Sequence, residues 1–220
     1  MNNELLYILA YYAHFDIQRK GHRFIMRPII LASASPRRRE ILASLGVKFT
    51  VLAADADEAC TLCDPAQFAK TLAGRKGRAV FELLSAQGKA SDAVILSADT
   101  VVVCDGEILG KPRDRDDACR MLRLLRGRTH HVITGIGVTV DGVTHLSHSD
   151  TSVRVADIPD DAIERYVDSG DPMDKAGAYG IQGAFSRWIS GIDGCYFGVV
   201  GLPIHALAEL YEQAVGEPLC

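Results

Sequence analysis

The chain has 220 residues, of which 48% are hydrophobic, and this length suits one large domain or two small lobes with a real core. Its 24 Lys and Arg against 28 Asp and Glu give a net charge of −4, which excludes a general nucleic-acid binder because such proteins carry a basic surplus. No segment is apolar for long enough to span a bilayer, and six cysteines are too few for a disulfide scaffold. We therefore expect a cytoplasmic protein with neither a nucleic-acid nor a membrane partner.

The first 27 residues stand apart from the rest. Residues 5–13 are apolar, but the leader before them lacks the positive charge of a signal peptide. A polar connector and Met26 then precede the first strand-like segment. We expect residues 1–27 to be an N-terminal extension in front of a folded domain that spans residues 28–220. An N-terminal helix that packs on a partner is the alternative, and it stays open.

Residues 28–45 predict a buried strand, a tight turn and a helix. Ser35 suits the N-cap of that helix and Pro36 suits its first position. The three arginines at 37–39 lie at the positive end of the helix dipole, where cations are unfavourable and anions are favoured. Free N–H groups, serine hydroxyls and guanidiniums converge there, so the turn predicts a phosphate or polyphosphate site. A solvated basic turn is the alternative.

The second predicted strand spans residues 47–53, and an acidic turn follows it. Asp55, Asp57 and Glu58 either cap this turn or bind a hard cation. A nearby polyanion site favours the cation, because bound triphosphate usually arrives with Mg²⁺. The C-x-x-C pair that follows, Cys60 and Cys63, has no second pair at zinc-site spacing, and we interpret it as incidental.

Asp64 opens a long predicted helix with a capping box, in which Gln67 is the second member. Lys76 lies in this helix within a basic cluster, for which a solvated face is the alternative to a functional role. The residues expected on its core-facing stripe are Phe68, Leu72, Ala79 and Leu83.

A second informative stretch spans residues 93–112. Two strand-like runs, 94–96 and 101–104, flank Asp99 and Thr100, and a strong hairpin turn follows at residues 105–106. A lone buried carboxylate is costly, so Asp99 must be paired, bound to metal or catalytic. Lys111 follows the hairpin and can return its ammonium to this region, where an internal ion pair with Asp99 is the alternative to catalysis.

The remaining elements are predicted from periodicity and turn signals. We expect helices at 113–126 and 159–166, strands at 132–140 and 143–155, a third hairpin at 187–199 and a last helix from 203. Between them, the loop 174–183 carries three glycines beside Gln182, an arrangement that lets a backbone approach a ligand while the amide reads a base edge. P-loop and dinucleotide fingerprints are missing.

Four separated motifs together resemble the Maf-like nucleoside triphosphate pyrophosphatase family. They are LASASPRR at 31–38, DE at 57–58, SADTV at 97–101 with GKP at 110–112, and DKAGAYGIQG at 174–183 followed by VGLP at 200–203. The resemblance covers the chain from Pro28 to the C-terminal helix. It implies an α/β fold with an elongated mixed β-sheet flanked by helices, two lobes and a central cleft, similar to the inosine-triphosphatase fold. Members are often dimeric, so it also implies a homodimer.

The resemblance implies hydrolysis of a nucleoside triphosphate to the monophosphate and pyrophosphate with Mg²⁺ or Mn²⁺. Glu58 and Asp99 would bind the metal, and Asp99 would also accept the proton of the attacking water. Lys76 and Lys111 would neutralise charge on the leaving pyrophosphate. The family tends to have alanine where this chain has Gly77, which leaves the placement of Lys76 open.

The residues implied to hold the phosphates are Ser33, Ser35, Arg37 and Arg38. Arg37, Thr100 and Gln182 match the branch that resembles dTTP/UTP pyrophosphatases, so we expect dTTP, UTP and modified pyrimidines such as 5-methyl-UTP as substrates in a house-cleaning role. A pyrophosphatase for purine triphosphates is one alternative. Another is a nucleotide-binding regulator of septum formation without turnover, which the intact acids Glu58 and Asp99 argue against.

Overall fold

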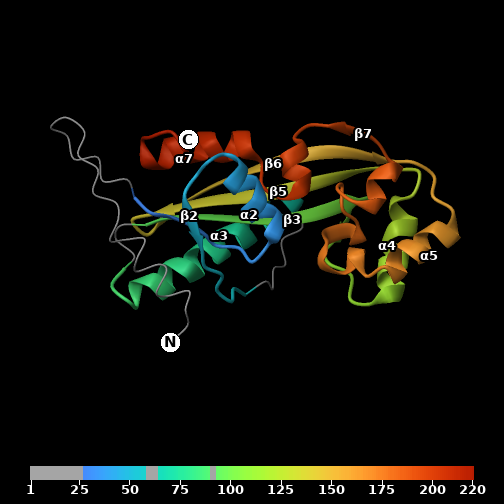
Figure 1. Cartoon of the computed structure of the whole chain (residues 1–220), viewed down its shortest axis with the longest axis horizontal. Helices are drawn as coiled ribbons and strands as arrows, with labels where there is room; N and C mark the ends of the chain where they lie inside the picture. Colours follow the sequence, from blue (N-terminus) through green and yellow to red (C-terminus); the bar gives the residue numbers. More distant parts are fainter. Residues whose placement is uncertain (1–26, 58–63, 90–92) are drawn as a thin grey trace.

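The computed structural model describes residues 27–57, 64–89 and 93–220. Its centre is a mixed seven-stranded sheet in the order β2-β1-β3-β5-β6-β7, with β4 also paired to β3 (Figure 1). The strands are β1 Ile29–Leu31, β2 Phe49–Val51, β3 Val94–Cys104, β4 Glu107–Leu109, β5 Thr129–Val140, β6 Val143–Val155 and β7 Ile189–Asp193. The helices are α2 Pro36–Ser44, α3 Pro65–Ser85, α4 Arg115–Leu125, α5 Asp160–Asp168, α6 Tyr196–Val200 and α7 Ile204–Val215, with 3₁₀ turns η2 Asp171–Asp174, η3 Ala176–Ala178 and η4 Ala184–Trp188.

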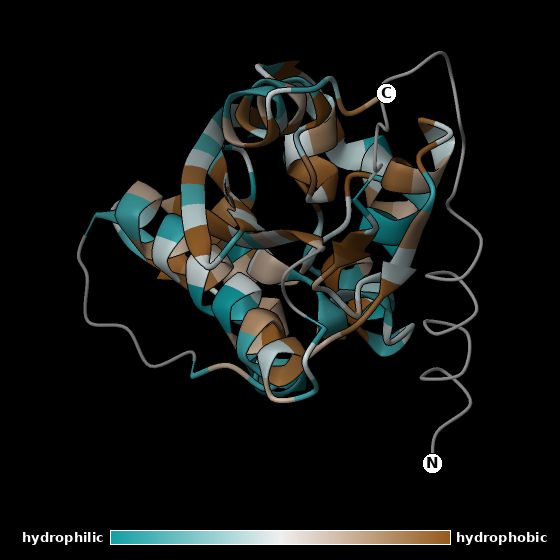
Figure 2. Cartoon of the chain, turned by 90° about the vertical axis from the view of Figure 1, so that its left-hand side faces the viewer, coloured by the Kyte–Doolittle hydropathy of each residue, from teal (hydrophilic) through white to brown (hydrophobic). Residues whose placement is uncertain are grey.

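The predicted fold class is confirmed. Strands β1 and β2 pair in parallel with their neighbours, whereas β3, β5, β6 and β7 form an antiparallel series. Figure 1 shows the long strands running the length of the molecule, with α4 and α5 gathered at one end and α2, α3 and α7 at the other. The buried apolar residues form one large cluster at each end. The helices in Figure 2 carry alternating teal and brown bands, as expected for amphipathic helices that cover a sheet.

Strand β3 is continuous through the polar residues that were expected to interrupt it. It runs for 11 residues and includes Asp99 and Thr100. On one side its whole middle pairs with β5. On the other side, β1 covers residues 94–96 and β4 covers residues 102–104. Among the described strands, none pairs with residues 97–101 on that second side, so the SADTV motif lies in a gap between β1 and β4.

The predicted core stripe of α3 is confirmed at Leu72 and in part at Phe68, which is half-buried against a small apolar cluster, whereas it is wrong at Leu83. Leu83 is 40% exposed. The residues that α3 buries are Ala69, Leu72, Ala73, Gly77, Val80 and Leu84. They are mostly small because the helix lies very close to β5, where a Cβ on Gly135 would come within 2.3 Å of the backbone carbonyl of Ala69. A pattern search that favours large apolar side chains misses such a contact.

The predicted hairpin at 187–199 is also wrong in its second half. Strand β7 pairs with β6, but the chain then turns into α6 instead of returning as a strand. The Cys195 sulfur accepts a hydrogen bond from the Gly198 N–H at 3.3 Å, which caps the new helix. Cysteine is not a usual N-cap residue, so the sequence carried no clear signal for this helix. Strand β2 is shorter than the predicted 47–53.

In the three described ranges, helices long and apolar enough to cross a membrane are lacking. The N-terminal extension up to residue 26 and the C-x-x-C pair lie outside the described residues.

Replacement of Gly135 by alanine should destabilise the protein strongly. The added methyl group would meet backbone atoms of α3 at 2.3 Å, so the helix must shift away from the sheet. We expect a loss of about 3 kcal/mol in the free energy of unfolding, measured by urea titration. Gly110→Ala is the matched control, because open space surrounds that position, and its effect should stay within about 0.5 kcal/mol. Equal effects of the two variants would contradict the close packing of α3.

The buried imidazole of His130 should make the fold sensitive to mild acid. His130 is 1% exposed, its Nε2 lies 2.7 Å from the Tyr179 hydroxyl, and burial lowers its pKa to about 4. The unfolded chain binds this proton near pH 6.5, before the native state does, so stability falls as the pH drops from about 6.5 to 4. The loss from this group should be about 3 kcal/mol. His130→Gln should show a correspondingly smaller difference between unfolding free energies at pH 7 and pH 4, and an unchanged difference would refute the assignment.

Candidate active site

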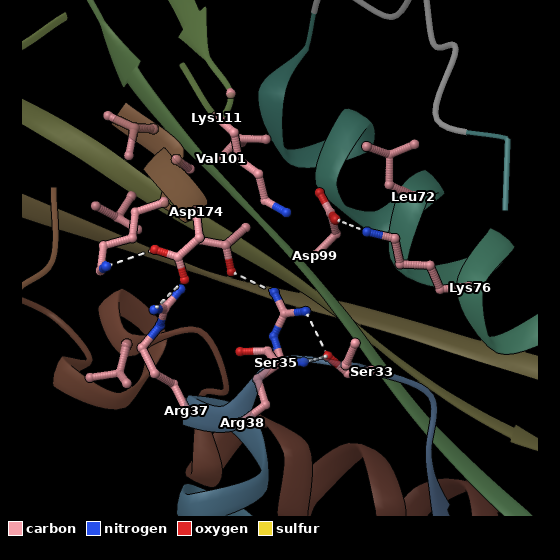
Figure 3. A pocket seen from close by; sticks show the side chains of 18 of the residues that line it. Ser33, Ser35, Arg37, Arg38, Leu72, Lys76, Asp99, Val101, Lys111 and Asp174 are labelled. Carbon is pink, nitrogen blue, oxygen red and sulfur yellow. Dashed lines mark hydrogen bonds and ion pairs between the residues drawn. The ribbon is translucent and has the colours of Figure 1, made fainter. Parts of the chain in front are cut away.

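A pocket of about 1100 Å³ lies over the gap beside β3 (Figure 3). Its walls come from the turn before α2, from α3, from the middle of β3 and from the segment 174–182. This volume suits a small-molecule ligand of nucleotide size. The predicted site residues that line it are Ser33, Ser35, Arg37, Arg38, Lys76, Asp99, Thr100, Lys111 and Gln182. Glu58 lies outside the described residues, so its predicted role as a catalytic residue and metal ligand stays a prediction.

The turn between β1 and α2 is held in place by Arg38. The buried Ser33 hydroxyl accepts hydrogen bonds from the Ser35 N–H and from Arg38 Nη1, both at 3.2 Å. Arg38 also donates to the Gly201 carbonyl at 2.8 Å and to the Thr100 hydroxyl at 3.0 Å. Burial lowers the pKa of the Arg38 guanidinium, while the charge of Asp99 opposes this shift. The guanidinium therefore ties together three segments that are distant in sequence, and two of its five N–H groups remain for a ligand.

The N-terminus of α2 faces the pocket with its serine and arginine side chains. Ser35 occupies the N-cap position, yet its hydroxyl makes no capping bond within the described part of the chain. Arg37 lies on the pocket wall and its guanidinium donates to Asp174 at 3.0 Å. Backbone N–H groups, hydroxyls and guanidiniums thus converge here, which is the arrangement expected for an anion site.

Asp99 is paired, as its burial requires. The carboxylate is 13% exposed, and its Oδ1 lies 2.5 Å from the Lys76 ammonium. The residue after Lys76 explains this reach: a Cβ on Gly77 would lie 2.9 Å from the Thr139 hydroxyl oxygen and 3.0 Å from that of Ser97. Glycine at this position therefore lets α3 come close enough for Lys76 to reach β3. Although the family tends to have alanine at position 77, Gly77 does not displace Lys76 from the pocket.

The alternative in which Lys111 serves as the ion-pair partner of Asp99 is not what the structure shows. That partner comes from α3, because Lys76 lies directly over β3 while Lys111 follows β4 at the exposed rim of the pocket. In Figure 3 the Lys111 ammonium nevertheless points toward the Asp99 carboxylate from the other side. Two lysines from different elements are thus directed at one carboxylate.

The acidic residues of the pocket fit a divalent cation. Asp99 and Asp55 both line the pocket, and carboxylate oxygens are the ligands that Mg²⁺ and Mn²⁺ prefer. Clusters of three or more His, Cys, Asp or Glu are missing from the described residues. Mg²⁺ is commonly held by one or two carboxylates together with substrate phosphates, so a full protein cage is not required. Asp99 is the described residue best placed to hold it.

The glycine-rich segment approaches β3 closely and brings Gln182 to the rim. Gly177 has a positive φ of 69°, and a Cβ there would lie 2.9 Å from Val102 of β3. The exposed Gln182 lines the pocket. Thr100, predicted as a substrate-binding residue, also lines the pocket, and its hydroxyl hydrogen-bonds with Arg38 at 3.0 Å and with Thr134 at 2.9 Å.

The sequence reasoning missed three kinds of pocket residue. Asp174 and Lys175 form ion pairs at the pocket wall, where the only sequence signal was their place at the start of the glycine-rich loop. Tyr179 is buried and its hydroxyl meets His130. An apolar part of the wall comes from Phe68, Leu72 and Val101, which sequence periodicity assigned to core packing alone.

Comparison with known proteins agrees with this geometry. The family model described as Maf-like protein matches residues 28–214. A dTTP/UTP pyrophosphatase of Symbiobacterium thermophilum is 44% identical over 189 residues, which cover 86% of this chain and 94% of that protein. A dTTP/UTP pyrophosphatase of Koribacter versatilis is 46% identical over 187 residues, covering 84% of this chain and 94% of the relative.

A third relative gives the same result. The dTTP/UTP pyrophosphatase of Thermococcus kodakarensis is 44% identical over 184 residues, which cover 84% of this chain and 95% of that protein. The motifs that meet in the pocket all lie inside the matched range. The chain belongs to the Maf-like protein family.

Proposed function

We propose that this protein is a nucleoside triphosphate pyrophosphatase that hydrolyses dTTP and UTP to the monophosphate and pyrophosphate. The observation that carries this proposal is the single pocket in which the Asp99 carboxylate faces the basic turn of α2. Arg37, Arg38, Lys76 and Lys111 all line that pocket. The names of the relatives support the same reaction and the same substrates.

In this proposal the reaction is attack of water on the α-phosphorus, with cleavage of its bond to the bridging oxygen of the β-phosphate. Asp99 takes the proton from the water, and its position is fixed because β3 is paired with β5 and one carboxylate oxygen is held by Lys76. A bound Mg²⁺ or Mn²⁺ would polarise phosphoryl oxygens and neutralise their charge. Asp99 and Glu58 would hold that cation.

The cationic side chains stabilise the charge that builds on the leaving pyrophosphate. Such a reaction needs positioning and electrostatic stabilisation more than covalent help. Lys76 and Lys111 approach from α3 and from the segment after β4, so they flank the carboxylate. The α2 turn, with Ser33, Ser35 and its arginines, supplies donors for the remaining phosphate oxygens.

The pyrimidine preference rests on a smaller set of contacts. The amide of Gln182 offers both a donor and an acceptor, which suits the N3–H and carbonyl oxygens of uracil and thymine. One amide discriminates weakly, so modified pyrimidines such as 5-methyl-UTP fit the same proposal. The proposal also includes a cytoplasmic location, a homodimer and a catalytic domain spanning residues 28–220, for which the resemblance and the range 28–214 of the family match are the support.

A nucleotide panel tests the function directly. We expect pyrophosphate release from dTTP, UTP and 5-methyl-UTP with Mg²⁺ or Mn²⁺, and slower release from CTP, ATP, GTP, ITP and 7-methyl-GTP. Asp99→Asn should lower kcat by at least about 100-fold, because the variant loses the proton acceptor. Circular dichroism confirms that the variant is folded. Turnover of purines alone would refute the specificity, and tight binding without turnover would favour the regulator.

The two lysines should separate into different phenotypes. The Lys76–Asp99 pair is largely buried, with exposed fractions of 23% and 13%, so Lys76→Met should lower both the melting temperature and kcat. Lys111 is exposed at the rim, so Lys111→Met should lower kcat/KM by about tenfold with an unchanged melting temperature. Thermal unfolding and steady-state kinetics measure the two effects. Equal changes in melting temperature would contradict this division.

A further inference from the structure

The ion pair between Arg37 and Asp174 joins two segments that are far apart in the sequence. Arg37 lies in the first turn of α2, and Asp174 ends η2 at the opposite pocket wall. Their side chains meet at 3.0 Å, with Arg37 29% exposed and Asp174 60% exposed. Both residues line the pocket, and Figure 3 shows the two side chains reaching toward each other across its lower part.

Asp174 is itself anchored to the interior. Lys175, only 13% exposed, donates to the Asp174 carboxylate at 2.7 Å and to that of Asp171 at 3.1 Å, and it also contacts the Asp171 carbonyl. The Asp171 carboxylate accepts a 2.7 Å hydrogen bond from the buried Tyr166 of α5, whose ring packs against Phe185. The carboxylate that faces Arg37 is therefore connected through Lys175 to the core of the molecule.

The electrostatic environment keeps this carboxylate charged. Burial alone would raise the pKa of Asp174, but hydrogen bonds from Lys175 and Arg37 outweigh it, and the pKa lies below its ordinary value. An ion pair this exposed contributes little to stability. Its main physical effect is on Arg37, because it orients the guanidinium and occupies one terminal nitrogen. It also offsets the charge that Arg37 presents to an anion.

We propose that Asp174, held by Lys175, is a positioning residue for nucleotide selection that fixes the guanidinium of Arg37 and competes with phosphate oxygens for it. This inference rests on the proposed function. With Asp174 in place, Arg37 attracts a bare polyphosphate less strongly and keeps one orientation toward the nucleotide, to which its other N–H groups donate. Without Asp174, the Arg37 guanidinium moves more freely and its charge is not offset, so it attracts any polyphosphate. The choice among nucleotides would then depend less on the shape of the base and more on the charge of the phosphates.

Asp174→Asn tests the proposal through binding and turnover together. Binding is measured by calorimetry with the α,β-methylene analogues of dTTP and CTP, which are not cleaved at that bond, and with inorganic tripolyphosphate. We expect tripolyphosphate to bind about threefold or more tightly to the variant, because Asp174 no longer pairs with the Arg37 guanidinium or competes with the phosphate oxygens for it. The preference for the dTTP analogue over the CTP analogue, and the matching ratio of kcat/KM values, should fall by about fivefold. Lys175→Gln should lower the dTTP/CTP ratios in the same direction, because it releases Asp174, but it should not raise the tripolyphosphate affinity, because it also removes a cation from the pocket wall.

Asp168→Asn is the matched control. It breaks the Arg115–Asp168 pair, which has a similar length of 2.8 Å and a similar 58% exposure of the carboxylate but does not line the pocket. We expect this variant to leave the tripolyphosphate affinity and both ratios unchanged. In an Arg37→Gln background, Asp174→Asn should add no further change, because the residue on which it acts is missing.

The outcomes separate this inference from the proposed function. If Asp174→Asn lowers the melting temperature but leaves the tripolyphosphate affinity and the dTTP/CTP ratios unchanged, Asp174 has only a structural role and the inference is wrong. If it acts equally with and without Arg37, the inference is also wrong. If the wild type binds nucleotides without hydrolysing them, the proposed function fails, while the binding ratios still decide the role of Asp174.

Discussion

The close approach of α3 to the sheet is the constraint on which the pocket depends. Gly135 removes the side chain that would otherwise meet the backbone of Ala69, and Gly77 leaves room for the Ser97 and Thr139 hydroxyls. Since Lys76 precedes Gly77, the same approach carries its ammonium to Asp99 at 2.5 Å. A helix only slightly farther from β3 and β5 would leave Asp99 without this partner. The packing of small residues and the electrostatics of the pocket are therefore one arrangement, and a change in one alters the other.

Arg38 has a similar role on the opposite wall. Its guanidinium contacts the β1–α2 turn through Ser33, the strand β3 through Thr100 and the end of α6 through the Gly201 carbonyl. These contacts determine where α2 begins relative to the sheet. The basic turn that first indicated an anion site thus also holds α2, β3 and the end of α6 together. Lysine could not replace Arg38 here, because a single ammonium cannot present three donors in this planar arrangement.

The sequence predicted the class of fold and most strands, and the predicted site residues that the structure describes all line the pocket, because hydrophobic periodicity and the four motifs carry that information locally. It failed where the deciding contact is distant. The buried face of α3 follows from a glycine in β5, and the α6 helix begins at a cysteine cap that no propensity favours. Asp174 pairs with a residue 137 positions earlier, so its neighbourhood in the sequence indicated a ligand-approaching loop but not this ion pair. Glu58 lies outside the described residues, and its position stays a prediction.

Because of the gap along β3, the strands that border the pocket entrance differ from the strand that holds the SADTV segment in place. Residues 97–101 are held from one side by β5, while β1 and the short hairpin strand β4 end on either side of the opening. The width of the opening is set by where these two short strands stop, and the ladder between β3 and β5 takes no part in it. Insertions or deletions in the turn at residues 105–106 can thus reshape the β4 border of the entrance, while the backbone of Asp99 stays in register and the β1–α2 turn keeps its serine and arginine side chains in place. Protein engineering therefore has a route to a wider entrance: remodel the β4 border and keep the central strand.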